Sequence, residues 1–193
     1  MDIFIISILI LFAYLLGSIS AAILTCKLMG LPDPREEGSH NPGASNVLAL
    51  GGEKAAAITL FGDALKGLVP VLIGLYLGLN ELSLSLIAFA SFMGHLYPVF
   101  FKFEGGKGVA TAFGIFIGLN WQVAFCVLVT WLIIIKIFKL SALGALLTAL
   151  LAPLYFYLLD GSFYFTSLSL VLSLLLIYRH LSNIINIING TED

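Results

Sequence analysis

The stretch IFIISILILFAYLLGSISAAILTC, residues 3–26, decides the fold class because it runs for 24 residues without a charge. A helix needs about 20 apolar residues to cross the hydrocarbon core of a bilayer. A secretory signal has a shorter apolar core of about 7–15 residues after positive charge, whereas only Asp2 precedes this run. We therefore predict that residues 3–26 form a retained membrane-spanning helix.

Apolar runs of similar length recur along the chain. The run 108–135 has 28 uncharged residues, which as one helix would measure about 42 Å and exceed the hydrocarbon core. Asn120, near its middle, is typical of an interfacial turn, so we split this run into two spans. The expectation is an all-α, polytopic membrane protein with seven transmembrane helices, at 3–26, 55–79, 82–101, 109–119, 121–140, 140–159 and 161–178.

The overall composition agrees with a membrane class. Hydrophobic residues make up 60% of the 193 residues and charged residues only 10%, with a mean hydropathy of +1.08. Too few charges are present to cover a soluble surface of this size. No basic stripe interleaved with aromatics is present, so we expect no nucleic-acid partner. Two distant cysteines predict neither a disulfide framework nor a zinc site, and the length predicts one domain, 1–193.

The distribution of Lys and Arg predicts the orientation. Eight of the nine such residues fall at or beside the first, third and fifth connections or near the C-terminus, which the predicted spans place on one side; Lys66 alone lies inside a span. Cytoplasmic loops carry the excess of positive charge. We therefore expect a periplasmic N-terminus and a cytoplasmic C-terminus.

A first polar cluster, 31–46, is richer in small donors than a turn requires. Arg35 offers a charged fork suited to phosphate or carboxylate, and glycines let a backbone approach a ligand. The alternative is a solvated loop rich in turn residues. The candidate ligand-binding residues of this cluster are Arg35, Ser39, Asn41 and Asn46.

A second cluster, 103–111, contains Gly105, Gly106 and Gly108 around Lys107, just before a predicted helix. Free backbone N–H groups, the helix N-terminus and the lysine together favour an anion. The spacing differs from a Walker A loop because Val109 follows the last glycine. The alternative is a flexible turn.

A third cluster, 178–183, follows the last span. If the helix continues, His180 and Asn183 lie at i,i+3 and Arg179 and Asn183 at i,i+4, so they share a face. The alternative is an interfacial cap. His95, near the end of the third span, either contributes to a polar site or hydrogen-bonds a neighbouring helix.

Asp63 and Lys66 lie inside the second span. Charges in hydrocarbon are costly and usually mark function or a polar cavity. They either pair with each other, or Lys66 faces a phosphate site while Asp63 orients it. Acidic residues and histidines are not clustered, so we expect no metal site, and the residues contain neither a G-x-S-x-G elbow nor HExxH.

These clusters, in this order, resemble the bacterial acyl-phosphate:glycerol-3-phosphate acyltransferase family (PlsY). Two departures are visible: His40 stands where a small residue is expected, and the tail after Ile184 is apolar where basic character is expected. The resemblance extends over most of the chain and is carried by Gly17-Ser18, by GSHNPGASN at 38–46, GDALKG at 62–67, GHLYPVFFKFEGGKGVAT at 94–111 and RHLSNI at 179–184.

The resemblance implies transfer of a fatty acyl group from acyl phosphate to glycerol 3-phosphate, giving 1-acyl-glycerol 3-phosphate (lysophosphatidic acid) and phosphate, the first step of phospholipid synthesis. It also implies a location in the bacterial inner membrane, in contact with membrane lipid, and the predicted topology places the active site on the cytoplasmic face. We expect no cofactor and infer no protein partner. The rival interpretations are a small anion or phosphate transporter or channel, whose site is expected near the midplane, and a non-enzymatic scaffold.

Because acyl phosphate is already activated, catalysis can consist mainly of positioning and oxyanion stabilisation. We hypothesise that Lys107 and the 105–108 amides hold one phosphate, and that Arg35 with Ser39 holds another. Asn183 and His180 then stabilise the oxyanion or orient the attacking hydroxyl. The base is either His180 or a phosphate oxygen of the substrate. The expected catalytic residues are thus Lys107, His180, Asn183 and Ser39. The expected phosphate-binding and substrate-binding residues are Arg35, Asn41, Asn46, Lys66, His95, Gly105, Gly106 and Gly108.

Overall fold

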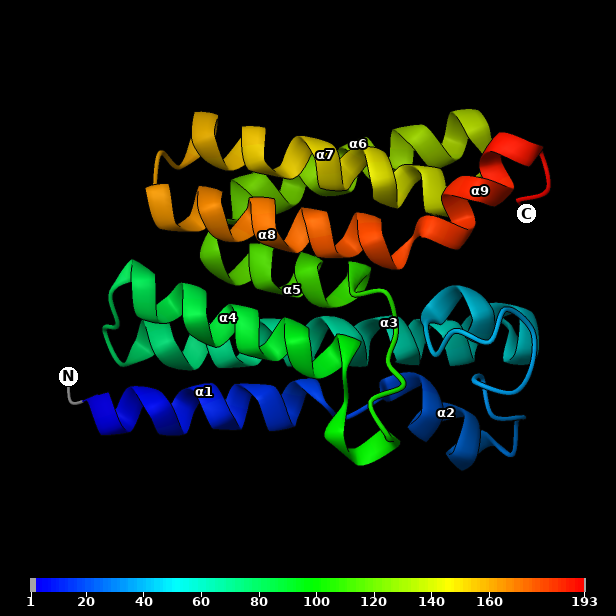
Figure 1. Ribbon diagram of the computed structural model, residues 1–193, viewed down its shortest axis with the longest axis horizontal. Helices are drawn as coiled ribbons and strands as arrows, with labels where there is room; N and C mark the ends of the chain where they lie inside the picture. The colour runs from blue at the N-terminus through cyan, green and yellow to red at the C-terminus, as the bar shows by residue number, and fades with distance from the viewer. Residues whose placement is uncertain (1–2, 193) are drawn as a thin grey trace. The chain divides into compact units, whose positions relative to one another are not determined.

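The computed structural model describes residues 3–192, and every regular element within that range is helical. The helices follow one another along the chain in the order shown in Figure 1. They are α1 (Ile3–Gly17), α2 (Ala21–Met29), α3 (Ala44–Tyr76), α4 (Glu81–Leu96), the 3-10 helix η1 (Val99–Phe101), α5 (Val109–Leu119), α6 (Trp121–Phe138), α7 (Ser141–Leu159), α8 (Phe163–Arg179) and α9 (Leu181–Asn189).

The chain divides into two compact units, Met1–Gly118 and Leu119–Asp193. In the first unit α4 packs against both α1 and α3, and α2 packs against α3. Two glycines let α1 and α4 approach closely. A Cβ at Gly17 would meet the Ser91 carbonyl, and one at Gly94 would meet the Tyr14 carbonyl. Small residues at such crossings are the usual means of close packing between membrane helices.

Helix α5 is held against α3 in the same manner. A Cβ at Gly67 would meet the carbonyl of Thr111, and one at Gly114 would meet the carbonyl of Ala64. With 11 residues, α5 is short for a span, and its first residue directly follows the glycine-rich loop. Close backbone packing therefore fixes the position of the start of α5, which directly follows the loop that contains Lys107.

We expected residues 3–26 to form one continuous helix. The structure shows instead that this run is bent by 41° between α1 and α2. Ser20 begins α2 as its N-cap and accepts a hydrogen bond from the Ile23 N–H at 3.3 Å. The Ile19 carbonyl accepts instead from Lys66 Nζ at 2.9 Å. The run thus breaks because a serine and a buried lysine take over backbone groups that a continuous helix would pair.

Helix α3 begins eleven residues before the span predicted at 55–79, so that Asn46 lies in its first turn rather than in a loop. The sequence pattern hid this start because Gly51 and Gly52 interrupt it, and Gly52 is left-handed at φ 75°. The helix bends there instead of ending. Consequently the polar cluster 31–46 ends on a rigid element.

Each proline inside a helix frees the carbonyl four residues earlier, and in both helices a serine from a neighbouring helix donates to it. Pro70 frees the carbonyl of Lys66, which accepts from Ser91 Oγ at 2.6 Å. Pro153 frees the carbonyl of Ala149, which accepts from Ser173 Oγ at 2.6 Å. These buried hydrogen bonds join α3 to α4 and α7 to α8.

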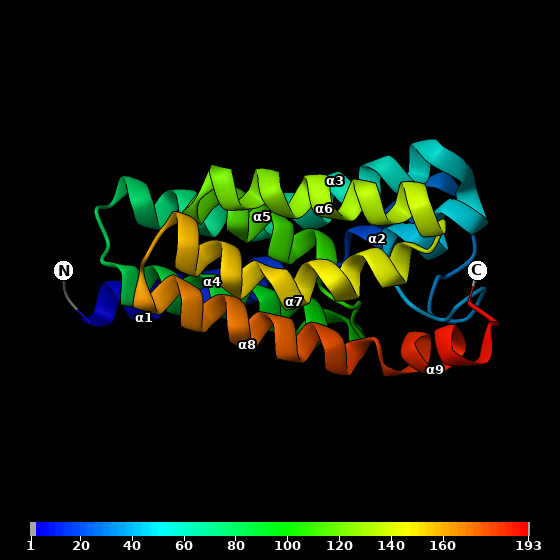
Figure 2. The ribbon, with the colours of Figure 1, turned by 90° about the horizontal axis from the view of Figure 1, so that it is seen from above.

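The second unit consists of α6, α7 and α8 running alternately up and down, followed by α9 (Figure 2). Asn120 starts α6 as its N-cap, accepting from the N–H groups of Gln122 and Val123 at 2.9 and 3.2 Å, and donates to Asp160 at 2.8 Å. The predicted break of the run 108–135 at Asn120 is therefore confirmed.

The chain bends by 57° between α8 and α9. His180 occupies the junction, and its N–H donates to the carbonyls of Leu176 and Ile177. The prediction that Arg179 and Asn183 share one helix face assumed a continuous helix and is wrong at this bend. The Asn183 amide donates to Glu192.

Four helices are long and apolar enough to cross a bilayer, and up to six spans result when each bent pair, α1 with α2 and α8 with α9, counts as one. Helix α5 is a further, shorter apolar helix. The described residues thus form an all-α, polytopic membrane protein. The number of seven spans and the orientation of the termini stay predictions.

Candidate active site

Two polar segments, the 30–43 loop and the 97–108 loop, meet at one end of the first unit. Arg35 Nη1 of the first loop lies 3.4 Å from Glu104 Oε2 of the second. A Cβ placed on Gly106 would lie 3.0 Å from the Pro42 carbonyl. Residues about 65 positions apart in the sequence therefore lie side by side. That Arg35 and Lys107 bind substrate together stays a prediction.

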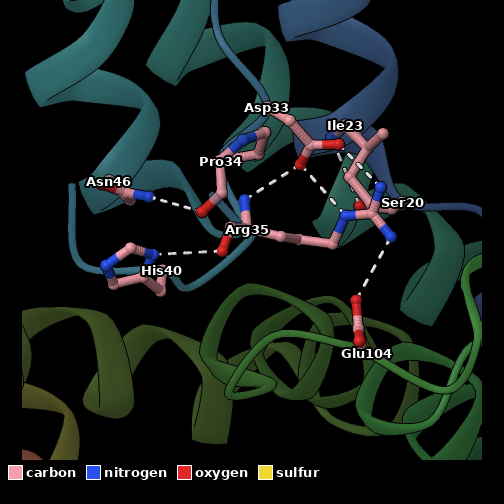
Figure 3. Close-up of polar contacts among 8 residues, drawn as sticks. All are labelled: Ser20, Ile23, Asp33, Pro34, Arg35, His40, Asn46 and Glu104. Atoms are coloured by element: carbon pink, nitrogen blue, oxygen red, sulfur yellow. Dashed lines mark hydrogen bonds and ion pairs between the residues drawn. The ribbon is translucent and has the colours of Figure 1, made fainter. Parts of the chain in front are cut away.

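Arg35 is held by two carboxylates (Figure 3). Its Nη2 lies 2.6 Å from Asp33 Oδ2, and its Nε donates to Asp33 Oδ1 at 3.0 Å. These bonds lower the pKa of Asp33 and raise the pKa of Arg35. The arginine side chain is still 24% exposed, so its permanently charged fork can reach an anion that displaces the weaker contact to Glu104.

Asn46, predicted as a substrate-binding residue, shapes the first loop through three backbone contacts. Its Oδ1 accepts from the Ser39 N–H at 3.0 Å, and its Nδ2 donates to the carbonyls of Pro34 at 2.8 Å and Glu37 at 3.0 Å. The side chain is 4% exposed. Its amide thus holds the backbone around the exposed Ser39 in place. Figure 3 shows it pointing at the Pro34 carbonyl.

His40 adopts a left-handed conformation with φ 56°, which costs energy for a residue with a side chain. Its Nδ1 lies 3.2 Å from the Arg35 carbonyl. A positive φ favours glycine, which agrees with the small residue that the family resemblance led us to expect at this position. Asn41, the next candidate, is half-buried, and its carbonyl accepts from the Gly43 N–H at 2.9 Å.

The glycine loop, residues 105–108, leads directly into α5. Gly105, Gly106 and Gly108 are buried, and Lys107 is half-buried between them. Gly108 has φ 94°, and a Cβ there would meet the ring of Phe92, so only glycine fits. Its carbonyl accepts from the Ala112 N–H at 2.8 Å, the first hydrogen bond of α5. Lys107 is thus placed where a helix start favours an anion.

A buried ionic cluster lies beneath these loops and joins α3 to α4. Lys66 Nζ lies 2.9 Å from Asp63 Oδ1, and the same oxygen lies 3.6 Å from His95 Nδ1. All three side chains are at most 6% exposed. Lys66 therefore does pair with Asp63, the first of the two alternatives, and also donates to the broken first span. Its predicted contact with phosphate stays a prediction.

His180 and Asn183 belong to the second unit. His180 is buried, and its Nδ1 lies 2.8 Å from the Leu176 carbonyl, which is one turn earlier on α8. This contact orients the ring at the bend. His180 directly precedes α9 and Asn183 lies in its first turn.

Sequence reasoning missed three contributors: Asp33, Ser91 and the Ile19 carbonyl. Asp33 had a usable signal, since an acid two residues before Arg35 in a loop is well placed to hold it. The sequence signal for Ser91 was weaker. Pro70 indicates that the carbonyl four residues earlier is free, but it does not indicate which residue donates to that carbonyl. Among residues 3–192 no group of three or more His, Cys, Asp or Glu side chains could hold a metal ion.

Comparison with known proteins bears directly on this site. A family model described as glycerol-3-phosphate acyltransferase matches residues 7–190. A glycerol-3-phosphate acyltransferase of Hydrogenovibrio crunogenus is 53% identical over 182 residues, covering 94% of this chain and 87% of the relative. One of Methylococcus capsulatus is 52% identical over 184 residues, covering 95% and 93%.

Solved structures agree with these relatives. The crystal structure of PlsY (YgiH), an integral membrane glycerol 3-phosphate acyltransferase in its glycerol 3-phosphate form, has a TM-score of 0.93 at 37% identity and covers 97% of this chain and 94% of that one. Its lysophosphatidic acid form has a TM-score of 0.91 at 35% identity. The chain therefore belongs to the glycerol-3-phosphate acyltransferase family of integral membrane enzymes.

Proposed function

We propose that this acyltransferase uses acyl phosphate as its donor and glycerol 3-phosphate as its acceptor. In that reaction the 1-hydroxyl of glycerol 3-phosphate attacks the acyl carbonyl. The new ester C–O bond forms, the C–O bond to phosphate breaks, and inorganic phosphate leaves with the electron pair. The products are 1-acyl-glycerol 3-phosphate and phosphate, which makes this the first step of phospholipid synthesis.

The observation that supports this proposal is the meeting of two cation-bearing loops at one end of the first unit. Arg35 and Lys107 lie on loops that contact each other through Glu104 and Pro42. Both substrates carry phosphate, so a site with two separate cations suits a reaction between them. The mixed anhydride is already activated, so positioning the two phosphates supplies much of the rate enhancement.

We infer the following roles for the loop residues. Lys107 and the amides of Gly105, Gly106 and Gly108 hold one phosphate, and Arg35 with Ser39 holds the other. Asn41 and Asn46 support the second subsite, Asn46 by holding the loop backbone. Lys66 and His95 are also expected among the substrate-binding residues. They act from the buried ionic cluster that lies beneath the two loops.

His180 and Asn183 enter the catalytic set through the resemblance. Asn183 stabilises the tetrahedral oxyanion or orients the hydroxyl. The hydroxyl proton passes to His180 or to a phosphate oxygen of the substrate. We further propose that residues 1–193 act as one domain with seven spans in the bacterial inner membrane, with the active site and C-terminus cytoplasmic and the N-terminus periplasmic.

The test is acyl transfer by purified protein in detergent, with lysophosphatidic acid as the measured product. Lys107→Ala is expected to lower kcat/KM by about 10²-fold or more, the scale of losing one charge-stabilising group. Lys102→Ala is the matched control, because Lys102 is an exposed lysine on the same loop and should leave the rate unchanged. Near-normal kcat and KM for Lys107→Ala would contradict its phosphate role. Equal product from acyl-CoA would contradict the choice of donor.

A further inference from the structure

Two glycines of the glycine loop, Gly105 and Gly106, pack against His95 of α4. A Cβ on Gly106 would lie 2.5 Å from His95 Nε2 and 2.9 Å from its Cε1, so the imidazole edge abuts the loop backbone. A Cβ on Gly105 would meet the His95 and Leu96 carbonyls. The two glycines that precede Lys107 therefore pack against different parts of the same residue, one against its side chain and one against its backbone.

The first loop reaches the same place. The Pro42 carbonyl lies 3.0 Å from the position that a Gly106 Cβ would take. The His95 ring and the Pro42 carbonyl therefore both border the side of Gly106 on which a side chain would lie. A shift of the ring towards Gly106 would have to move the glycine loop.

Buried charges fix the ring itself. His95 Nδ1 faces Asp63 Oδ1 at 3.6 Å, and the same oxygen is held by Lys66 at 2.9 Å. Lys66 is anchored in turn by the Ile19 carbonyl at 2.9 Å. Because His95 is only 6% exposed, the ring has little freedom. A chain of contacts therefore runs from the broken first span to the backbone beside Lys107.

We propose that His95 is a positioning residue, held by Asp63, that sets the place of the glycine loop and hence of the Lys107 ammonium. The inference rests on the proposed function in one respect, that the glycine loop binds a substrate phosphate. It differs from the sequence expectation because His95 acts through the loop backbone and not as a substrate ligand. Misplacing a binding group by about 1 Å can cost about 10²-fold in rate, so a small movement of this ring has a measurable effect.

The test is a double-mutant cycle between Gly106→Ala and His95→Ala, with KM measured for acyl phosphate and for glycerol 3-phosphate. His95→Ala is the suitable partner because it leaves the Asp63–Lys66 pair intact. Gly106→Ala is expected to raise one KM by about tenfold or more, since the new methyl group collides with the ring and moves the loop. Adding His95→Ala removes the two closest atoms and leaves only the 3.0 Å approach to the Pro42 carbonyl. The KM of the double variant should therefore return most of the way to that of His95→Ala alone.

Gly105→Ala is the matched control. Its methyl group would collide with backbone carbonyls, which His95→Ala leaves in place, so its effect should multiply with that of His95→Ala. Independent effects of Gly106→Ala and His95→Ala on both KM values would overturn the inference, as would coupling that appears only in the melting temperature. If Gly106→Ala does not fold, recovery of monodisperse protein in the double variant supports the contact, and its failure to recover overturns it.

The outcomes separate this inference from the proposed function. Loss of activity in Lys107→Ala without coupling between Gly106 and His95 refutes only the positioning role. Normal kinetics in Lys107→Ala refute the phosphate-binding role of the loop, whatever the cycle shows. If Gly106→Ala and His95→Ala are coupled in KM and Lys107→Ala is inactive, the positioning role of His95 and the phosphate-binding role of the loop are both supported.

Discussion

The buried ion pair between Asp63 and Lys66 allows the sharpest prediction about stability. Lys66→Met removes the partner of Asp63 at 2.9 Å and the donor to the Ile19 carbonyl at 2.9 Å. Removing one member of a buried pair typically costs about 3–5 kcal/mol because the other charge stays buried. Leaving the part-buried Ile19 carbonyl without its donor adds about 1–3 kcal/mol. The expected loss in the free energy of unfolding is therefore about 4–8 kcal/mol from these two effects.

The double variant Asp63→Asn with Lys66→Met isolates the charge contribution. It removes both charges and keeps only the cost of the Ile19 carbonyl, so it should be more stable than Lys66→Met alone by about 3–5 kcal/mol. The assay is unfolding of detergent-solubilised protein by increasing denaturing detergent, followed by helical circular dichroism. Lys54→Met is the matched control, since Lys54 is an exposed lysine on the same helix, and its effect should stay within about 0.5 kcal/mol.

Two results would refute this reasoning. One is a Lys66→Met protein as stable as the wild type, and the other is a double variant no more stable than the single one. A stable Lys66→Met protein with a raised KM for a phosphate substrate would instead favour the second sequence interpretation, in which Lys66 faces the phosphate site.

Three further predictions concern other parts of the chain. Ser173→Ala should cost about 0.6 kcal/mol and at most about 1.7 kcal/mol in the same unfolding assay, and less in a Pro153→Ala background, where a restored N–H takes the freed carbonyl. His40→Gly should raise stability by up to about 1 kcal/mol by relieving the left-handed backbone, seen as a higher melting temperature; a lower one would contradict the strain. The pKa of Asp33 is lowered by its hydrogen bond to Arg35, so its stabilising effect is complete above the unfolded pKa of about 3.9 and is lost as pH falls through the folded value. The melting-temperature difference between wild type and Asp33→Asn should therefore be constant above about pH 5 and shrink in stronger acid; a difference that grows in acid would reverse the sign.

Hydrophobic run lengths predicted the helices well because a lipid-facing helix needs a long uncharged stretch, whatever its neighbours are. The break at Asn120 was predictable for a related reason, since a polar side chain in the middle of an overlong run is an N-cap signal. The breaks after Gly17 and at His180 were not. The break after Gly17 depends on Lys66, a distant residue that donates to the Ile19 carbonyl. At His180 the contacts are local, to the carbonyls of Leu176 and Ile177, and no hydrophobic pattern marks them.

Part of the candidate site was also predictable from the sequence, and part was not. Arg35, Lys107 and the glycines stood out because dense donors are unexpected between apolar spans. The supporting contacts did not, because Asn46 was assigned to a loop and Asp33 was passed over. The His95 contact with Gly106 joins residues on opposite sides of η1, and no spacing rule links an imidazole to the glycine that packs against it.

The sequence by itself determined that this chain is a membrane protein and where most of its apolar helices lie, because composition and run length report directly on the solvent that each residue meets. It also indicated which polar clusters are candidates for anion binding. Only the tertiary structure decided that Lys66 pairs with Asp63, that Ser91 and Ser173 satisfy the carbonyls freed by prolines, and that His95 seats the glycine loop. The physical reason is that buried polar groups must find partners, and the partner is set by which helices pack together rather than by neighbours in the chain.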